Sequence, residues 1–440
     1  MAGEGRRRNF GADWEELFVR YILLGALVAL AGCAGAVSST PQAPASLQNN
    51  AATWDVSNAV GSAKITHVIY IVQEGRSFDD LFQGYPGART TPTGEISTGK
   101  SIALSPISLK ARYDIDTQAR AMFISCDGTG KLPGTACRMN GFNNEERYGG
   151  PKGVEYPMYA YVPHEESKPY FDMAREWVVA DHVFASQIDG SFTAHQYIVA
   201  AQSGHAIGLP DGSWGCQGGK NDSIATLTQR RRYGPYESAC FTYKTLANEL
   251  ERAHLSWRFY TADKATSSFA FDKRVYGSPQ WNRDVVQPPS RFLNDVANGK
   301  LANMTWITPT CADSDDVNCG GGGGPPWVAS LVNAVGESKF WSSTAVFVQW
   351  DDWGGLYDEV APRFKDYDGL GFRVPLLVIS AYAKHGHVSN ARYETTSVLR
   401  FTEDIFGLRQ LTEADRRATS PAADCFDFSQ RPRKFIPIKT

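Results

Sequence analysis

The chain has 440 residues, of which 42% are hydrophobic and 21% are charged, and its formal net charge is −3. This composition is that of an ordinary globular protein with enough length for a full core, and the small net charge gives no indication of nucleic-acid binding. Length alone suggests two or three domains, although large α/β enzymes often consist of one.

The first 33 residues have the features of a bacterial export signal. A basic start at residues 6–8 precedes the apolar run YILLGALVALA at 21–31, which is too short for a permanent membrane-spanning helix. The run ends in Leu30-Ala31-Gly32-Cys33, which resembles a lipobox, in which the cysteine is lipidated and becomes the first residue of the mature protein. We therefore predict an exported lipoprotein anchored to a membrane through Cys33, in the periplasm or at the cell surface. The alternative is ordinary signal cleavage, with Cys33 incidental.

Residues 34–63 are rich in Ala, Ser, Pro, Gln and Asn and lack periodicity, which predicts a flexible linker before a folded domain at 64–440. Beyond Cys33 the chain has seven cysteines, and export favours disulfides. The sequence does not fix their connectivity. Three pairs are close along the chain, with Cys425 left over: Cys126 with Cys137, Cys216 with Cys240, and Cys311 with Cys319.

The folded part alternates between apolar runs and helical patterns, which predicts an α/β fold with a largely parallel sheet covered by helices on both faces. In such sheets, functional sites form beyond the carboxyl ends of the strands. The predicted strands are His67–Val72, Trp177–Phe184, Trp257–Thr261, Met304–Ile307, Ala345–Trp350 and Val374–Ser380. The predicted helices are Ser77–Phe82, Tyr170–Arg175, Thr193–Gln202, Leu246–Ala253, Trp327–Val335 and Thr396–Phe406.

Polar residues follow three of these strands. Glu74 comes directly after the first strand, Ser191 lies in an Asp-Gly-Ser turn after the second, and Asp351 and Asp352 follow the strand that ends at Trp350. Adjacent carboxylates repel each other unless a cation or a basic group is near, and oxygen ligands suit a hard divalent metal. A serine at a helix N-terminus beside such a cation is a candidate nucleophile. The alternatives are solvated turns for the acidic residues and a plain N-cap for Ser191.

Longer motifs surround these residues, namely VQEGRSFDDLF, DGSFTAHQY and WDDWGGLYDEV. They resemble motifs of the bacterial phosphoesterase family that contains phosphatidylcholine-type phospholipases C and related acid phosphatases. VQEGRSFDDLF at 72–82 looks like the family's QENRSFD motif. DGSFTAHQY at 189–197 looks like its GPSFPAHQY segment, and WDDWGGLYDEV at 350–360 looks like its DDWGGFYDHV segment. Blocks at 372–389 and 398–408 also match, so the resemblance covers nearly the whole predicted folded domain.

The resemblance implies an alkaline-phosphatase-like fold and a phosphoric ester hydrolase of the phospholipase C or phosphatase type. Carried over by position, Ser191 would be the nucleophile, and Glu74, Asp351 and Asp352 would bind one divalent metal ion. Metal-bound Ser191 would attack phosphorus, and water would hydrolyse the resulting phosphoserine. The implied partners are a phosphate ester or phospholipid substrate and, through the lipid anchor, a membrane, but no nucleic acid.

Three further residues lie within these motifs. His195 comes one helical turn after Ser191, so it is spaced to face the same site as a second candidate catalytic residue, although a packing histidine in the core is the alternative. Arg76 is expected to pair with Glu74 or with a nearby aspartate. Asp358 belongs to the third motif and is expected to orient the site from behind the metal ligands.

The sequence departs from the family's motifs at several positions. Gly75 replaces an asparagine expected at the metal or the phosphate, Asp316 and Glu359 stand where the family has histidines, and a histidine expected around 114–117 is absent. Each such loss can lower a rate by roughly 10²–10⁴-fold. Two hypotheses therefore stay open: a metal-dependent phosphoesterase, or a weakened member of the family that binds phosphate esters as a lipoprotein.

Overall fold

The computed structural model describes residue 61 and residues 63–440. The predicted signal peptide, Cys33 and nearly all of the predicted linker lie outside these described residues. The described residues belong to one compact unit, which spans residues 50–440. Within them, no helix is long and apolar enough to cross a membrane.

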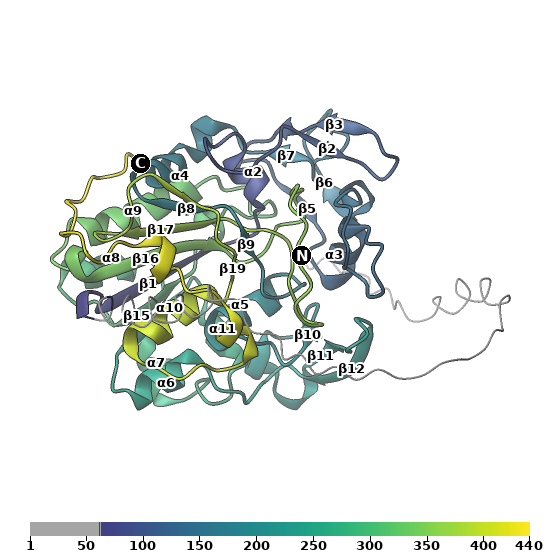
Figure 1. The fold of residues 1–440 in the computed structure, drawn as a ribbon. Coiled ribbons are helices and arrows are strands. Elements are labelled where there is room, and N and C mark those ends of the chain that lie inside the picture. The colour runs from purple at the N-terminus through teal and green to yellow at the C-terminus, as the bar shows by residue number, and fades with distance from the viewer. Residues whose placement is uncertain (1–60, 62) are drawn as a thin grey trace, which may run out of the picture. The chain divides into compact units, whose positions relative to one another are not determined.

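An eight-stranded sheet forms the centre of this unit, with the strand order β14-β13-β15-β1-β16-β17-β8-β18 (Figure 1). Every neighbouring pair is parallel except the two pairs that β17 makes, so the sheet is mostly parallel, as predicted. The strands are β14 (Val285–Val286), β13 (Trp257–Tyr260), β15 (Met304–Ile307), β1 (His67–Gln73), β16 (Thr344–Trp350), β17 (Leu376–Ser380), β8 (Val178–Ala180) and β18 (His387–Ser389).

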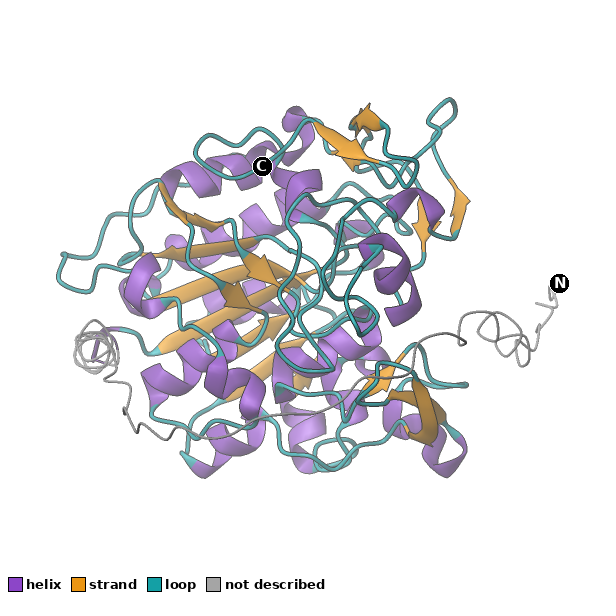
Figure 2. Cartoon of the chain, turned by 45° about the vertical axis from the view of Figure 1, so that its right-hand side comes forward, coloured by secondary structure: helices purple, strands orange, loops and turns teal. Residues whose placement is uncertain are grey.

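Helices cover both faces of this sheet, and the runs of β-branched and aromatic residues in its strands are buried between them (Figure 2). This arrangement confirms the predicted α/β class. The helices are α2 (Phe78–Phe82), α3 (Ala119–Cys126), α4 (His164–Glu176), α5 (Ser191–Ala200), α6 (Leu246–Arg252), α7 (Pro279–Asp284), α8 (Arg291–Ala297), α9 (Gly324–Gly336), α10 (Ser397–Phe406), α11 (Glu413–Arg417) and α12 (Ala422–Cys425).

Short strands form small sheets beside the central one. The largest has three strands in the order β10-β11-β12, and the others are pairs. These strands are β2 (Thr93–Glu95), β3 (Ser101–Ala103), β4 (Ser105–Pro106), β5 (Tyr113–Ile115), β6 (Arg147–Gly149), β7 (Ala160–Tyr161), β9 (Val183–Phe184), β10 (Ala206–Ile207), β11 (Ser223–Leu227), β12 (Tyr233–Ser238) and β19 (Tyr393–Glu394).

Five of the six predicted strands are present within two residues of their predicted ends. The predicted strand 177–184 is wrong as one element, because it divides into β8 and β9, and β9 pairs with β19 outside the central sheet. A buried polar residue marks the break: the carboxylate of Asp181 accepts the Arg89 N–H at 3.0 Å and contacts the His182 ring at 2.6 Å. Helix α4 begins six residues before its predicted start, and Pro169 lies inside it.

The three predicted disulfide pairs are bonded in the structure: Cys126 with Cys137, Cys216 with Cys240, and Cys311 with Cys319. Cys425 is a buried free thiol. The bond between Cys311 and Cys319 closes the loop after β15, which carries Asp315 and Asp316 toward the carboxyl ends of the neighbouring strands. This loop is therefore constrained beside the candidate site.

Candidate metal-dependent active site

The central strands bring the acidic residues of two distant motifs together. β1 and β16 are parallel neighbours, and their last residues, Gln73 and Trp350, are directly paired. Glu74 and Asp351 are therefore adjacent where the two strands end, and the Asp351 N–H donates to the Gln73 carbonyl at 2.9 Å. This placement follows from parallel pairing and from the continuous apolar pattern of both strands.

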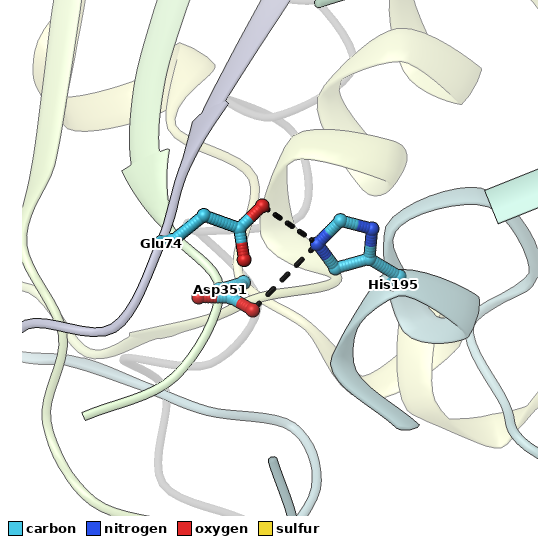
Figure 3. A group of neighbouring side chains, drawn as sticks. All are labelled: Glu74, His195 and Asp351. Atoms are coloured by element: carbon cyan, nitrogen blue, oxygen red, sulfur yellow. Dashed lines mark hydrogen bonds and ion pairs between the residues drawn. The ribbon is translucent and has the colours of Figure 1, made fainter. Parts of the chain in front are cut away.

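Helix α5 supplies the other side of the site. Gly190 is its N-cap residue, so Ser191 is its first residue, and His195 follows one turn later on the same face. The His195 Nε2 atom lies 3.1 Å from Glu74 Oε1 and 3.6 Å from Asp351 Oδ2 (Figure 3). One ligand atom from each of these three residues lies within 4.8 Å of the others, a spacing that can hold a metal ion.

The donor set of this group fits a divalent cation. Asp351 Oδ1 accepts the N–H groups of Gly75 and Asp352, each at 2.8 Å, whereas its buried Oδ2 has no hydrogen-bond partner. An ionised buried oxygen without a partner is costly unless a cation is bound to it. Two carboxylate oxygens and one imidazole nitrogen are common ligands of divalent metals.

Asp352, which the resemblance places among the metal ligands, is outside this three-residue group. Its Oδ2 accepts a hydrogen bond from the Ser191 hydroxyl at 3.3 Å, and its Oδ1 accepts the Gly354 N–H at 2.7 Å. The Ser191 hydroxyl also interacts with the carboxylates of Glu74 and Asp351. The structure therefore places the candidate nucleophile beside Glu74, Asp351 and Asp352, which we call the acidic cluster, and Asp352 accepts its hydrogen bond.

Burial and like charge set the protonation of these carboxyl groups. Burial, reinforced by the charges of Glu74 and Asp352, raises the pKa of Asp351 well above its usual range. Burial also raises the pKa of Asp352 to about 7, although the Gly354 N–H acts against this shift. A bound cation would reverse the effect of like charge on both groups.

The Glu74 and His195 pair behaves differently. Burial disfavours both charges, but each group stabilises the other, so the pKa of Glu74 is lowered and the pKa of His195 is raised. The His195 Nδ1 atom is buried and has no hydrogen-bond partner. The two side chains therefore form an ion pair in which His195 holds a proton at Nε2. A metal bound at Nε2 would replace this proton.

Arg76 does not pair with Glu74. Its guanidinium is buried and donates from Nε to the Asp315 carbonyl at 2.7 Å and from Nη1 to Asp80 at 3.0 Å. Its backbone N–H donates to the Asp352 carbonyl at 3.0 Å. Of the two expected pairings, the structure shows the one with an aspartate, and Arg76 ties three segments together behind the site.

Asp358 lies in a separate buried network. It forms an ion pair with Arg373 at 2.8 Å and accepts the Asp79 N–H at 3.1 Å. Neither contact reaches the acidic cluster directly, so any effect of Asp358 on the site passes through the segment that carries it. Glu359, which replaces a family histidine, pairs with Arg89 at 3.5 Å.

The remaining departures lie at the site itself. Gly75 has a φ of 37°, and a Cβ atom there would lie 3.1 Å from Gly354 Cα and 3.7 Å from Asp352 Oδ1. The carboxylate of Asp316 interacts electrostatically with Glu74 and with Asp352, which adds negative charge at the site. His195 was predicted as a catalytic residue from its four-residue spacing from Ser191, and the structure places it among the possible metal ligands, in contact with Glu74.

Comparisons with known proteins show the family of the chain. The Phosphoesterase family model matches residues 65–409. The non-hemolytic phospholipases C of Burkholderia pseudomallei and Pseudomonas aeruginosa are each 24% identical to the chain and cover 83% and 86% of it. The chain spans 58% and 59% of their lengths. Non-specific phospholipase C6 of Arabidopsis thaliana is 24% identical over 82% of the chain and 74% of its own length.

Solved structures of low similarity are also found. A protein in the alkaline phosphatase superfamily from Vibrio parahaemolyticus is 10% identical, with 84% of this chain and 79% of that chain covered and a TM-score of 0.37. Residue roles do not follow from similarity at this level. The family match covers most of the chain, and the chain belongs to the Phosphoesterase family.

Proposed function

We propose that the protein is a metal-dependent phosphoric ester hydrolase that uses Ser191 as its nucleophile. The observation that carries the proposal is the position of the Ser191 hydroxyl, at the N-terminus of α5 and 3.3 Å from Asp352. It lies beside the Glu74, His195 and Asp351 group, whose atoms are spaced to hold a cation. Family membership and the phospholipase C relatives support the same activity.

The residues of the chain have separable roles in this reaction. Glu74, Asp351 and His195 would hold a divalent metal, which when bound lowers the pKa of a nearby hydroxyl and offsets charge on a phosphate. Asp352 accepts a hydrogen bond from the Ser191 hydroxyl at 3.3 Å, so it is placed to orient this hydroxyl and to accept its proton. The N-terminus of α5 favours an incoming anion.

In the chemical step, Ser191 Oγ loses its proton to Asp352 and forms a bond to phosphorus, while the bond from phosphorus to the ester oxygen breaks and the alcohol leaves with a proton from solvent. Water then attacks the phosphoserine, the bond to Oγ breaks, and phosphate or a phosphorylated head group leaves. The names of the relatives favour a phospholipid as substrate. Export and anchoring through Cys33 are part of this proposal, and mass spectrometry of the mature N-terminus for a lipidated Cys33 tests them.

A second candidate is a phosphate-ester-binding lipoprotein with little turnover. Asp316 favours it, because its carboxylate stands where the family motif has a histidine and adds negative charge beside Glu74 and Asp352. The carboxylate of Asp316 would repel an anionic substrate unless a bound cation offsets its charge. Both candidates use the same residues, so turnover separates them.

The test is hydrolysis of p-nitrophenyl phosphate and p-nitrophenylphosphorylcholine by the parent protein, Ser191→Ala and Ser213→Ala, with and without added divalent metals. We expect metal-dependent turnover that falls by about 10³-fold or more in Ser191→Ala and is unchanged in the matched control Ser213→Ala. Full activity in Ser191→Ala would overturn the nucleophile. No turnover by a folded, metal-loaded parent would favour the binding lipoprotein.

A further inference from the structure

The three-stranded sheet beside the site carries exposed aromatic side chains on its outer strand, β12. Tyr233 is 51% exposed and Tyr236 is 65% exposed, although large hydrophobic side chains in the described chain are mostly buried. β12 pairs only with β11 in that sheet, so its other edge is free of strand partners within the described residues. In Figure 1 the β10-β11-β12 sheet lies at the lower right of the molecule.

An irregular register places both tyrosines on one face of this sheet. Tyr236 is opposite Ala225 and Tyr233 is opposite Leu227, with a register shift between these pairs. Ala225 and Leu227 are two residues apart and share a face, so their partners share it as well. Glu237 is opposite Ile224 and therefore points to the other face.

A neighbouring loop adds a third aromatic ring to this surface. Phe364 is 50% exposed, and the guanidinium of Arg231 lies 5.2 Å from its ring centre. Arg231 is buried, and it donates to the carbonyls of Asp366 at 3.1 Å, Tyr367 at 3.0 Å and Gly369 at 2.9 Å. These bonds fix the loop to the turn before β12, so the aromatic groups are held in place together.

Two exposed arginines flank the aromatic rings. Arg230 and Arg232 lie on either side of the buried Arg231, directly before Tyr233. Arginine forks match phosphate oxygens, and tyrosine rings favour the boundary between water and lipid because they have an apolar body and a polar tip. We refer to Arg230, Arg232, Tyr233, Tyr236 and Phe364 as the Tyr233 surface.

The three-stranded sheet is joined to the first turn of α5, which carries the candidate nucleophile. The Gly208 N–H, directly after β10, donates to Asp189 Oδ1 at 3.0 Å, and the Thr193 hydroxyl donates to the Ala206 carbonyl at 3.0 Å. Partial burial and the negative charges of Asp189 and Asp116 raise the pKa of Tyr233 to about 12. Asp189 is two residues before Ser191. The sheet that carries Tyr233 is therefore attached to the turn that presents the nucleophile.

We propose that the Tyr233 surface docks the protein onto a membrane that contains anionic phospholipid. The proposal rests on the proposed phosphoesterase function and deepens it, because docking there would bring Ser191 close to lipid head groups. Aromatic rings would enter the interface, and Arg230 and Arg232 would contact lipid phosphates. A second copy of the chain is a poorer occupant, since a two-fold contact would bring the same arginines together.

The test uses a protein that begins at Asn50, within the compact unit of residues 50–440, so that no lipid anchor or apolar leader contributes. Sedimentation measures how much protein binds to phosphatidylcholine vesicles and to the same vesicles with about 30% phosphatidylserine, which adds anionic head groups. We expect Tyr233→Ala/Tyr236→Ala/Phe364→Ala to weaken binding by about tenfold or more. Arg230→Ser/Arg232→Ser is expected to weaken binding by about 20–30-fold, with anionic vesicles only.

Two exposed residues elsewhere serve as matched controls. Tyr148→Ala, at a side chain 69% exposed, and Ile436→Ala, at one 53% exposed, are expected to bind like the parent. Absence of vesicle binding by the parent, equal binding by all variants, or loss of binding through dimer formation in light scattering would overturn the proposal.

Activity on a soluble ester separates this inference from the proposed function. Hydrolysis of p-nitrophenyl phosphate is expected to be unchanged in the Tyr233-surface variants, because none of these residues contacts the acidic cluster. Ser191→Ala is expected to bind vesicles like the parent. Failure of turnover with intact vesicle binding refutes only the phosphoesterase, and the reverse pattern refutes only the docking surface.

Discussion

Gly75 is the residue at which the site departs most directly from the family motif. Its φ of 37° is in the left-handed region, which asparagine tolerates better than other residues with a side chain. A Cβ atom there would lie 3.7 Å from Asp352 Oδ1, so an amide at this position would reach the acidic cluster. The position therefore accepts the family residue at a modest cost, because Gly354 must shift slightly.

We predict that Gly75→Asn raises metal-dependent hydrolysis of p-nitrophenyl phosphate by about tenfold, since it restores a polar ligand to the site. Gly75→Ala is the matched control, because it introduces the same backbone strain and the same Cβ atom without the amide. Initial rates at saturating metal measure both. Equal rates in the two variants would show that the missing amide does not limit this protein.

Glu145 is a buried carboxyl group outside the active site. Its Oε1 accepts the Ser125 hydroxyl at 2.5 Å, and its buried Oε2 has no partner. Burial raises its pKa to about 8, so the folded protein holds a proton that the unfolded chain releases near pH 4.5. The stability from this group is full at low pH and is lost as the pH rises through about 8.

Glu145→Gln is therefore predicted to increase the free energy of unfolding by about 1 kcal/mol or more at pH 9, with little change at pH 4. Denaturant titrations at the two pH values measure the difference. Glu146→Gln is the control, because its side chain is 61% exposed and its 3.9 Å contact with Arg120 is at the surface. A gain of the same size at both pH values would contradict the assignment.

At the scale of elements, the loop after β15 and the helix α5 position the site from opposite sides. The loop is closed by the bond between Cys311 and Cys319, eight residues apart, and its Asp315 carbonyl accepts from Arg76. The bond between Cys216 and Cys240, which are 24 residues apart, closes a longer segment that contains β11 and β12 of the three-stranded sheet. The longer closed segment is therefore expected to matter more for stability, and the shorter loop, which lies at the site, more for turnover.

We predict that Cys216→Ser/Cys240→Ser lowers the free energy of unfolding by about 3–4 kcal/mol, and Cys311→Ser/Cys319→Ser by about 2–3 kcal/mol. Cys311→Ser/Cys319→Ser is expected to lose more turnover than Cys216→Ser/Cys240→Ser, because only the shorter loop carries Asp316 beside Glu74 and Asp352. Thermal unfolding and initial rates, measured on the same samples, test the two rankings. The same ranking in both measurements would refute this division.

For the whole molecule, the candidate metal site would link ion binding to folding. The native fold gathers Glu74, His195 and Asp351, whereas the unfolded chain keeps them far apart, so a bound ion stabilises the folded state. At about 100 times its dissociation constant, an ion adds about 2.7 kcal/mol to the free energy of unfolding. Removal of metal with EDTA is expected to lower Tm accordingly.

Asp351→Asn is predicted to have opposite effects with and without metal. Without metal it raises Tm, because the burial cost of Asp351 and its repulsion by Glu74 and Asp352 disappear. With metal it abolishes the added stabilisation. Scanning calorimetry with and without EDTA measures both, and Asp211→Asn, at an exposed residue, is the control. A full metal-dependent shift in Asp351→Asn would remove Asp351 from the ligand set.

Much of the fold was predictable because continuous apolar runs identify strands buried on both faces. β1, β15 and β16 were placed within a residue, and the disulfide partners were the nearest cysteines along the chain. The break between β8 and β9 was not predictable from the local pattern. It depends on the contact of the Asp181 carboxylate with Arg89, which is distant in sequence, and with the ring of the adjacent His182. The start of α4 was missed because Pro169 normally argues against a helix interior.

The sequence by itself determined the α/β class, the family motifs and the identity of the residues at the strand ends, since these depend on local pattern. Only the tertiary structure decided how those residues are grouped. It placed His195 with Glu74 and Asp351, set Asp352 against Ser191, and turned Arg76 toward Asp80 and the Asp315 carbonyl. The reason is physical: distances between side chains from separate elements are set by strand pairing and helix packing, which spacing along one chain does not contain.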